Sequence, residues 1–208
     1  MVLNNTIRKI SVGIVVLVFT MAHLTAQTNY FNSFDGVKIA YNDEGSGQTI
    51  LLIHGFINSK SSWNKTELKK CLLSKGYRII TPDLRGNGDS EKPHTDEAYA
   101  DNAEVKDLLA LVDHLKLDNY MALGYSRGSI ILAELLTQEP RITKAVLGGM
   151  GIDFTNPNWD RRLLFADAFN GKTTDETKGA VAYAKSIKAD LQALHLQQKH
   201  QPSTSKKE

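Results

Sequence analysis

Residues 120–128 read Tyr-Met-Ala-Leu-Gly-Tyr-Ser-Arg-Gly, and this stretch decides the fold of the chain. Its apolar first half is too short for a helix, whereas apolar residues recur at helical spacing over the segment 126–138. The pattern therefore predicts a strand, a sharp turn at Ser126 and then a helix. Gly124 and Gly128 favour such a turn, because a strained strand-to-helix turn crowds the neighbouring strand and helix.

A serine at this kind of turn projects its hydroxyl above the sheet, where a nucleophile for acyl transfer is needed. The bare Gly-x-Ser-x-Gly pattern is weak evidence, and its position between a strand and a helix makes the interpretation specific. We expect Ser126 to be a catalytic nucleophile. The alternative is a packed structural turn.

Three further apolar runs are short and bounded by turn residues, as buried strands of a parallel sheet are. They cover residues 49–53, 78–81 and 144–148. Helical patterns lie between them, most clearly at 104–115 and less cleanly at 63–75. The alternation of strand and helix predicts a doubly wound, mostly parallel α/β sheet.

Both ends of this alternating region differ from it. Residues 30–41 alternate with period two around Asp35-Gly36, which predicts a β-hairpin. After Gly151 the segments 160–169 and 174–198 have helical patterns with no strand between them. We expect these helices to leave the sheet.

The motif His54-Gly55-Phe56 directly follows the predicted strand 49–53. Acyl transfer builds negative charge on the substrate oxygen, and two backbone N–H groups aimed at that oxygen stabilise it. Phe56 and Arg127, the residue after the serine, are positioned to supply them. Because the role of Phe56 depends on its amide, its side chain should be replaceable. For His54 we expect hydrogen bonds to the nearby loop backbone rather than proton transfer.

A third motif, Asp83-Leu-Arg-Gly-Asn-Gly-Asp-Ser90, follows the predicted strand 78–81. Its glycines suggest a phosphate-binding loop, but the spacing fits neither the P-loop nor the dinucleotide fingerprint. We interpret the segment as a structural turn bordering the site.

The three motifs, in this order and spacing, resemble the α/β-hydrolase fold in its lipase, esterase and proline-iminopeptidase-like branch, over about residues 30–150. The resemblance implies Ser126 as nucleophile, the amides of Phe56 and Arg127 as oxyanion hole, and helices within 160–198 as a cap. A serine at this position argues against the dehalogenase and epoxide-hydrolase branches of the family, which use aspartate there.

A serine hydroxyl needs a histidine to take its proton and a carboxylate to hold that histidine. In the family, the acid follows the serine along the chain, and the histidine follows the acid. Asp153 is the one weak candidate acid, with a loop or cap-hinge aspartate as the alternative. His195 and His200 fall in the last helical pattern, where a solvated helix face is the expected role. We therefore expect a fold that lacks its last strands and contains the beginning of a helical cap.

Two functions follow from this expectation. The first is a serine hydrolase that cleaves a small ester, amide or related acyl substrate, with the chain an incomplete form. The alternative is a catalytically inactive hydrolase fold that is inert or binds a ligand.

Residues 1–26 have the pattern of a secretory signal, with Arg8-Lys9, the apolar run 10–19 and cleavage after Ala26. The apolar run is shorter than the roughly 20 residues that a spanning helix needs. We expect an exported protein; membrane contact through an uncleaved anchor at 10–19 is the alternative. The predicted units are then a core over 27–152 and a cap region with a polar C-terminal end over 153–208.

Composition excludes several other classes. Lys and Arg total 25 against 23 Asp and Glu, so no one-sided basic field favours nucleic acid as a partner. The single cysteine, Cys71, cannot form an internal disulfide, and no Cys/His cluster has metal-ligand spacing. We expect no cofactor and no metal, and a small-molecule acyl substrate as the partner.

Overall fold

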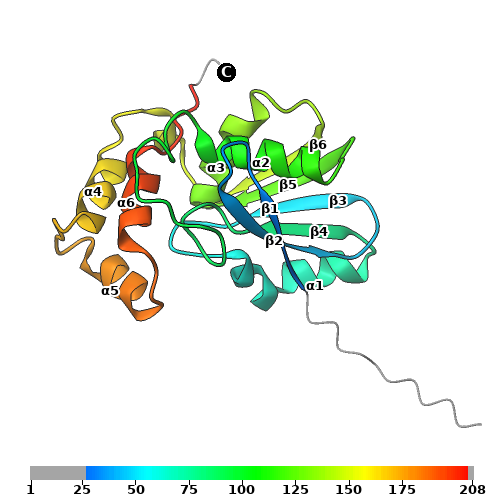
Figure 1. The fold of residues 1–208 in the computed structure, drawn as a ribbon, viewed down its shortest axis with the longest axis horizontal. Helices are drawn as coiled ribbons and strands as arrows, with labels where there is room; N and C mark the ends of the chain where they lie inside the picture. Colours follow the sequence, from blue (N-terminus) through cyan, green and yellow to red (C-terminus); the bar gives the residue numbers. More distant parts are fainter. Residues whose placement is uncertain (1–26, 206–208) are drawn as a thin grey trace, which may run out of the picture.

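The structure is a computed structural model that describes residues 27–205, so the predicted signal over 1–26 lies outside the described residues. Its centre is a six-stranded sheet in the order β1-β2-β4-β3-β5-β6 (Figure 1). β2 is antiparallel to β1 and β4, and the remaining neighbours are parallel. The strands are β1 Thr28–Asn32, β2 Lys38–Glu44, β3 Thr49–Ile53, β4 Arg78–Pro82, β5 Tyr120–Tyr125 and β6 Ile142–Gly148. The predicted mostly parallel α/β sheet is confirmed.

The predicted hairpin is formed by β1 and β2. Its turn is closed by a hydrogen bond from Gly36 N to Ser33 O at 3.0 Å. Gly36 has φ of +88°, a conformation that glycine adopts without the steric cost of a Cβ atom.

The middle of the sheet brings two predicted motifs together. Every residue of β3 is buried, as is typical of a central strand covered on both faces. β3 runs parallel to β5 with Ile53 opposite Gly124, so both strands end at the same edge. Gly55 and Ser126 follow those ends, and a Cβ atom on Gly55 would lie 3.2 Å from the Ser126 Cβ.

Helices cover the sheet as the apolar spacing predicts. They are α1 Glu67–Ser74, α2 Ala103–His114 and α3 Arg127–Leu136. The apolar stripe of α2 is buried in the main core with residues of β2, β3 and β5. The predicted helical stretch 63–75 is interrupted: a 3-10 helix, Lys60–Lys65, ends before Thr66, whose hydroxyl accepts from Lys69 N at 3.3 Å and begins α1.

The chain then leaves the sheet through a short 3-10 helix, Ile152–Thr155, and continues in α4 Asp160–Phe169, α5 Lys178–Ser186 and α6 Leu191–Lys199. These three helices lie together at one end of the molecule (Figure 1). They have their own apolar cluster, which includes Phe169, Val181 and Leu194 and reaches Ile57 of the core.

The last helix and the residues after it are attached to the core. Gln197 donates from Nε2 to Arg85 O at 2.5 Å, and Thr204 donates from its hydroxyl to Glu134 Oε2 at 2.9 Å. The sequence predicts a polar C-terminal end, but Gln201 and Thr204 are only 8% and 7% exposed. The boundary between core and cap region at 152/153 stays a prediction.

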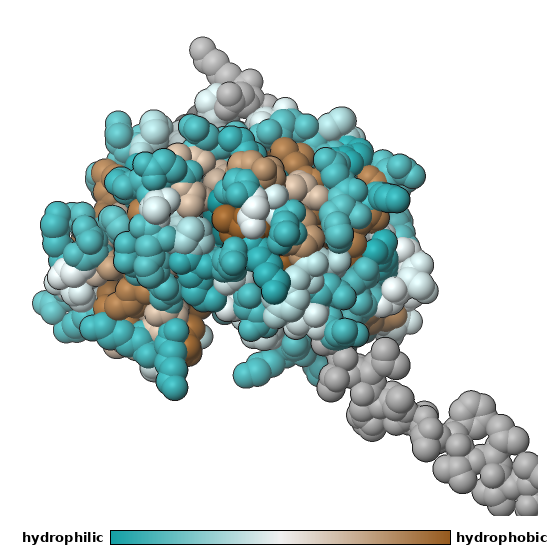
Figure 2. Space-filling view, in the orientation of Figure 1, coloured by the Kyte–Doolittle hydropathy of each residue, from teal (hydrophilic) through white to brown (hydrophobic). Residues whose placement is uncertain are grey.

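β6 is the outer strand of the parallel side. Within residues 27–205 it pairs with β5 alone, and Val146 and Leu147 are 56% and 47% exposed. Figure 2 shows hydrophobic patches interrupting an otherwise largely hydrophilic face. In the part of the chain that the structure describes, no helix has the length and apolar character to cross a membrane.

Candidate active site

The turn between β5 and α3 holds Ser126 in a strained backbone conformation. Its φ of +52° and ψ of −123° are unusual for a residue with a Cβ atom. Such strain persists only where the surrounding structure enforces it. A hydrogen bond from Ser126 N to Gly148 O, 2.8 Å long, ties the turn to the end of β6.

The two flanking glycines are required by lack of space. A Cβ atom on Gly124 would lie 2.4 Å from Gly128 O, and one on Gly128 would lie 2.3 Å from Ile53 O. The Ser129 hydroxyl bridges β5 and β6, because it donates to Gly124 O at 2.7 Å and accepts from Gly148 N at 3.0 Å. The turn is therefore closely packed at both glycines.

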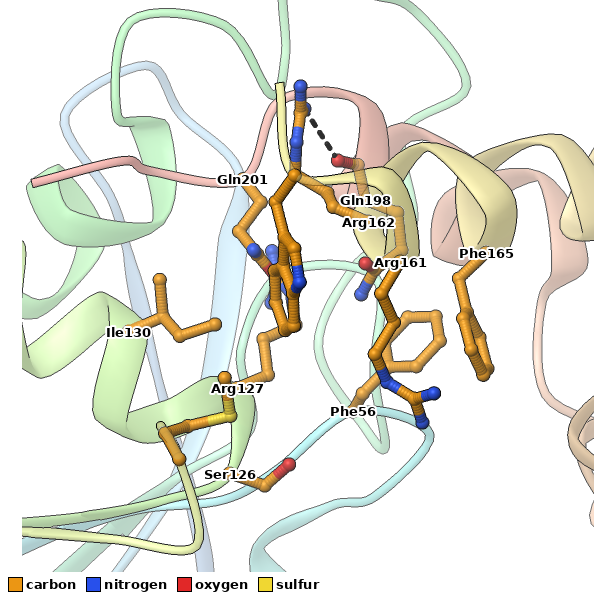
Figure 3. Close-up of a pocket in the computed structure, with 11 residues that line it drawn as sticks. Phe56, Ser126, Arg127, Ile130, Arg161, Arg162, Phe165, Gln198 and Gln201 are labelled. Carbon is orange, nitrogen blue, oxygen red and sulfur yellow. Dashed lines mark hydrogen bonds between the residues drawn. The ribbon is translucent and has the colours of Figure 1, made fainter. Parts of the chain in front are cut away.

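Ser126 opens on a pocket of about 100 Å³ between the sheet edge and the helices α4 and α6 (Figure 3). Phe56, Trp159 and Phe165 supply its aromatic surface. Trp159 and Phe165 are thus in the pocket wall as well as in the helical region that the sequence assigns to a cap. The polar part of the wall comes from arginine and glutamine side chains.

The two predicted oxyanion-hole residues both line this pocket with Ser126. Arg127 is the first residue of α3, where a backbone N–H has no partner inside the helix. Among the described residues, neither the Phe56 nor the Arg127 backbone N–H donates a hydrogen bond. Both amides are therefore without a protein acceptor in the described residues, and their role as oxyanion hole stays a prediction.

The side chain of Phe56 has a role that the sequence argument missed. Its ring meets those of Phe165 and Phe169 edge-on, with centroid distances of 6.3 and 5.2 Å. Replacing this side chain would remove both contacts, and the expectation that the catalytic role needs only the Phe56 amide stays a prediction. The motif His54-Gly55-Phe56 does not indicate that the Phe56 ring contacts residues so far away in the sequence.

The side chain of Arg127 is buried and paired with a carboxylate that is distant in the sequence. It donates through two nitrogens to Glu104 of α2, one of the distances being 2.8 Å, and to Gln197 O of α6, also at 2.8 Å. Arg127 and Glu104 are 2% and 4% exposed. These contacts of Arg127 link α3 to α2 and to α6.

His54 acts on the backbone, as expected. Its Nδ1 donates to Gly55 O at 2.8 Å, and its Nε2 accepts from Leu84 N at 3.1 Å. Burial lowers the pKa of the imidazole, which keeps the ring neutral and able to accept. The histidine therefore holds two loops in place beside the serine.

The loop 83–90 is a structural turn, as predicted. The Asp83 carboxylate accepts from Lys60 N at 2.6 Å, from Lys60 Nζ at 2.7 Å and from Asp89 N at 2.8 Å. A Cβ atom on Gly88 would lie 2.2 Å from Asp83 Oδ2, so the glycine is needed for the carboxylate to fit. The oxygens of Asp83 are occupied within the protein.

The remaining triad candidates do not line the pocket. Asp153 is exposed in the 3-10 helix, and its role as catalytic acid stays a prediction. His195 donates from Nδ1 to Ala166 O at 2.8 Å, so it joins α6 to α4 rather than forming a purely solvated face. His200 lies 2.6 Å from Asp96 Oδ1. Within residues 27–205 the Ser126 hydroxyl has no hydrogen-bond partner, and no cluster of three or more His, Cys, Asp or Glu could hold a metal ion.

The sequence profile of the alpha/beta hydrolase fold family matches residues 48–205. Because this match covers most of the chain, the chain belongs to that family. The strand-turn-helix around Ser126 and the adjoining pocket lie within the matched region.

Individual relatives show what the chain is similar to. Epoxide hydrolase 2 of Siraitia grosvenorii is 30% identical over 154 residues, which are 74% of this chain and 45% of the relative. The solved structure of an epoxide hydrolase mutant from Vigna radiata is 29% identical, with a TM-score of 0.60 over 76% of this chain and 51% of that one. An esterase from Exiguobacterium antarcticum, 24% identical, shares the fold with a TM-score of 0.62 over 86% of this chain and 75% of that one. The chain spans less than half the length of the curated relative.

Proposed function

We propose that this chain is a serine hydrolase in which Ser126 attacks a small ester, amide or related acyl substrate. The observation that carries the proposal is the strained Ser126 turn, held between two glycines that tolerate no side chain and open to the pocket. A protein stores backbone strain where function requires it. A packed structural turn would give no reason to aim the hydroxyl at a cavity.

The chemistry would proceed through an acyl-enzyme. The Ser126 oxygen bonds to the acyl carbon, and the carbonyl oxygen becomes an oxyanion that the Phe56 and Arg127 amides stabilise. The leaving group departs with a proton, and water then releases the acid and restores the serine. A base must carry the serine proton to the leaving group, and the pocket wall within residues 27–205 contains no histidine.

The similarity to epoxide hydrolases does not change the substrate class that we propose. The family resemblance described from the sequence implies that epoxide hydrolases have aspartate at the position where this chain has Ser126. A hydroxyl attacking an acyl carbon gives an ester that water cleaves readily, whereas attack on an epoxide would give an ether. We therefore favour acyl substrates.

We also propose that the protein is exported. The support is the signal pattern over 1–26, with cleavage after Ala26. The N-terminal residue of the protein recovered outside the cytoplasm would be Gln27. Recovery in a membrane fraction with residues 10–19 intact would instead favour the anchor.

A second candidate is a ligand-binding protein without turnover. The observation favouring it is the unpartnered hydroxyl of Ser126 within the described residues, together with the positions of His195 and His200 outside the pocket. On this account the pocket and the two free amides bind an acyl compound and release it unchanged.

Turnover of p-nitrophenyl acetate separates the two candidates. The proposed hydrolase releases p-nitrophenol at a rate that Ser126→Ala reduces to background, because no hydroxyl remains to be acylated. Ser61→Ala, a change at an exposed serine outside the pocket, should keep the full rate. A rate at background in the unmodified protein supports the ligand-binding alternative.

A further inference from the structure

Three residues that line the pocket beside Ser126 each carry a buried side-chain N–H without a hydrogen-bond partner within residues 27–205: Arg127 Nε, Arg162 Nε and Gln201 Nε2. Arg127 and Gln201 are 2% and 8% exposed. Buried donors without partners are rare in native proteins, and each calls for an explanation. Three at one cavity next to a candidate nucleophile indicate a missing acceptor.

The charged residues that line the pocket are arginines, and their positive charge, like the unpartnered N–H groups, favours a bound acceptor. Among the described residues, the wall contains arginines but no aspartate or glutamate. The charge of Arg127 is balanced by Glu104 outside the cavity. Within the part of the chain that the structure describes, Arg162 donates only to neutral carbonyls, those of Gln198 at 3.1 Å, Lys199 at 2.7 Å and Pro157 at 2.5 Å.

The electrostatics of Arg162 agree with this geometry. Burial lowers the pKa of its guanidinium, and no neighbouring carboxylate acts in the opposite direction. Its positive charge is therefore partly desolvated and unpaired, and an anion in the pocket would stabilise it.

Arg161 supplies a second positive charge from the same helix. Figure 3 shows its side chain reaching down from α4 to the side of Phe56. Its guanidinium carbon lies 4.8 Å from the centre of the Phe165 ring. It has one ion pair, with Glu176 at 3.3 Å, and both side chains are more than half exposed, so water weakens that pair.

From these contacts we propose that the pocket recognises a carboxylate carried by the acyl substrate, an inference that rests on the proposed hydrolase function. An ionised carboxylate accepts through two oxygens with about four lone-pair directions, which suits a wall that has several N–H donors and positive charges. Phe56, Trp159 and Phe165 cover the hydrocarbon part of such a substrate. The substrate class is then a short ester or amide with a free carboxylate.

Calorimetric titration of the full chain tests this directly. The probes are 3-phenylpropionate and 3-phenylpropanol, which share ring and chain and differ in charge, and Ser126→Ala serves as host so that nothing is turned over. We expect the carboxylate to bind at least about tenfold more tightly than the alcohol. Equal affinities would overturn the inference.

Two variants locate the binding group. Gln201→Met removes one donor without changing charge, and Arg161→Met removes one charge; each should weaken carboxylate binding about tenfold and leave alcohol binding unchanged. Gln192→Met, on the same helix as Gln198 but outside the pocket, should change neither. A Gln201→Met variant that weakens both probes equally would show a packing effect and count against the carboxylate site.

The failure of this inference is distinguishable from failure of the proposed function. A fluorophosphonate that labels Ser126 in a protein with no preference for the carboxylate removes the inference alone. A carboxylate preference in a protein whose Ser126 is never labelled removes the hydrolase and leaves the binding site.

Discussion

At the scale of single residues, Ser126 and its glycine neighbours show how little sequence is needed to define a turn. The spacing of Gly124, Ser126 and Gly128 predicts the turn, and the structure gives the reason, since no Cβ atom fits at either glycine. The hydroxyl of Ser129, which holds the turn through Gly124 O and Gly148 N, carries no such signal. Its partners come from β5 and β6, which only the folded sheet brings together.

Gly128→Ala should destabilise the protein by about 1–3 kcal/mol, because the new methyl group would lie 2.3 Å from Ile53 O and the strands must shift. Gly179→Ala is the matched control: it is an exposed position in α5 with open space, where alanine should add up to about 1 kcal/mol of stability. Equilibrium unfolding in urea measures both. Equal stabilities for the two variants would contradict the proposed crowding.

At the scale of elements, α6 connects the cap region to the site. Asp190 begins the helix by accepting from Ala193 N at 2.9 Å, Gln197 bonds the loop after β4, and Gln198 and Gln201 reach the pocket. Helix α6 therefore positions part of the pocket wall. Its attachment depends on charged groups that titrate.

We expect the stability that the Asp190 carboxylate gives to α6 to be lost in acid. Burial raises its pKa, but hydrogen bonds from Ala193 N and His94 lower it more, and the net pKa is below the usual range. A carboxyl whose pKa is lower in the folded than in the unfolded protein stabilises the fold above the unfolded pKa of about 3.9, and it loses that contribution as the pH falls.

The variant Asp190→Asn keeps the N-cap but not the charge. The wild type should exceed it in unfolding free energy by about 0.5–1 kcal/mol at pH 7, with the difference vanishing toward pH 2. Urea unfolding across this pH range checks the trend, and a constant difference would contradict it.

The buried Arg127–Glu104 pair joins α3 to α2. Glu104→Gln leaves an uncompensated buried charge and should cost about 3–5 kcal/mol of unfolding free energy. Arg127→Met combined with Glu104→Gln should recover part of that loss, because the buried charge is gone. A double-mutant cycle by chemical denaturation measures the coupling. Strictly additive effects would show that the two side chains do not act as a pair.

Local pattern predicted the elements better than the contacts between them. Residues 49–53 and 160–169 form a strand and a helix with the predicted bounds, because burial and periodicity leave a direct trace in sequence. The break at Thr66 was missed because capping by a threonine competes with an apolar pattern that continues through it. Burial of Gln201 was missed because a polar residue signals exposure until the packing is known.

At the scale of the whole molecule, the outer strand β6 is exposed on both faces in the described residues. β6 exposes Val146 and Leu147, and nearby Tyr125 and Ile152 are 56% and 61% exposed. An apolar outer strand with unpaired backbone groups is a template for pairing with another chain. We therefore expect the 208-residue chain to self-associate.

Val146→Lys should reduce this association, because a charge on an outer strand opposes strand pairing. Sedimentation velocity at two protein concentrations should show the wild type shifting to larger species and the variant shifting less. Leu163→Lys, an apolar-to-lysine change at a 44% exposed position of α4, should behave as wild type. Association unchanged by Val146→Lys would show that β6 is not the contact.

Covalent labelling shows whether Ser126 is an activated nucleophile. The protein isolated from the cells that make it is treated with a fluorophosphonate and examined by intact-mass and peptide mass spectrometry. The account predicts one adduct on the peptide containing Ser126, absent in Ser126→Ala and retained in Ser61→Ala. No adduct, or an adduct that survives Ser126→Ala, would contradict it.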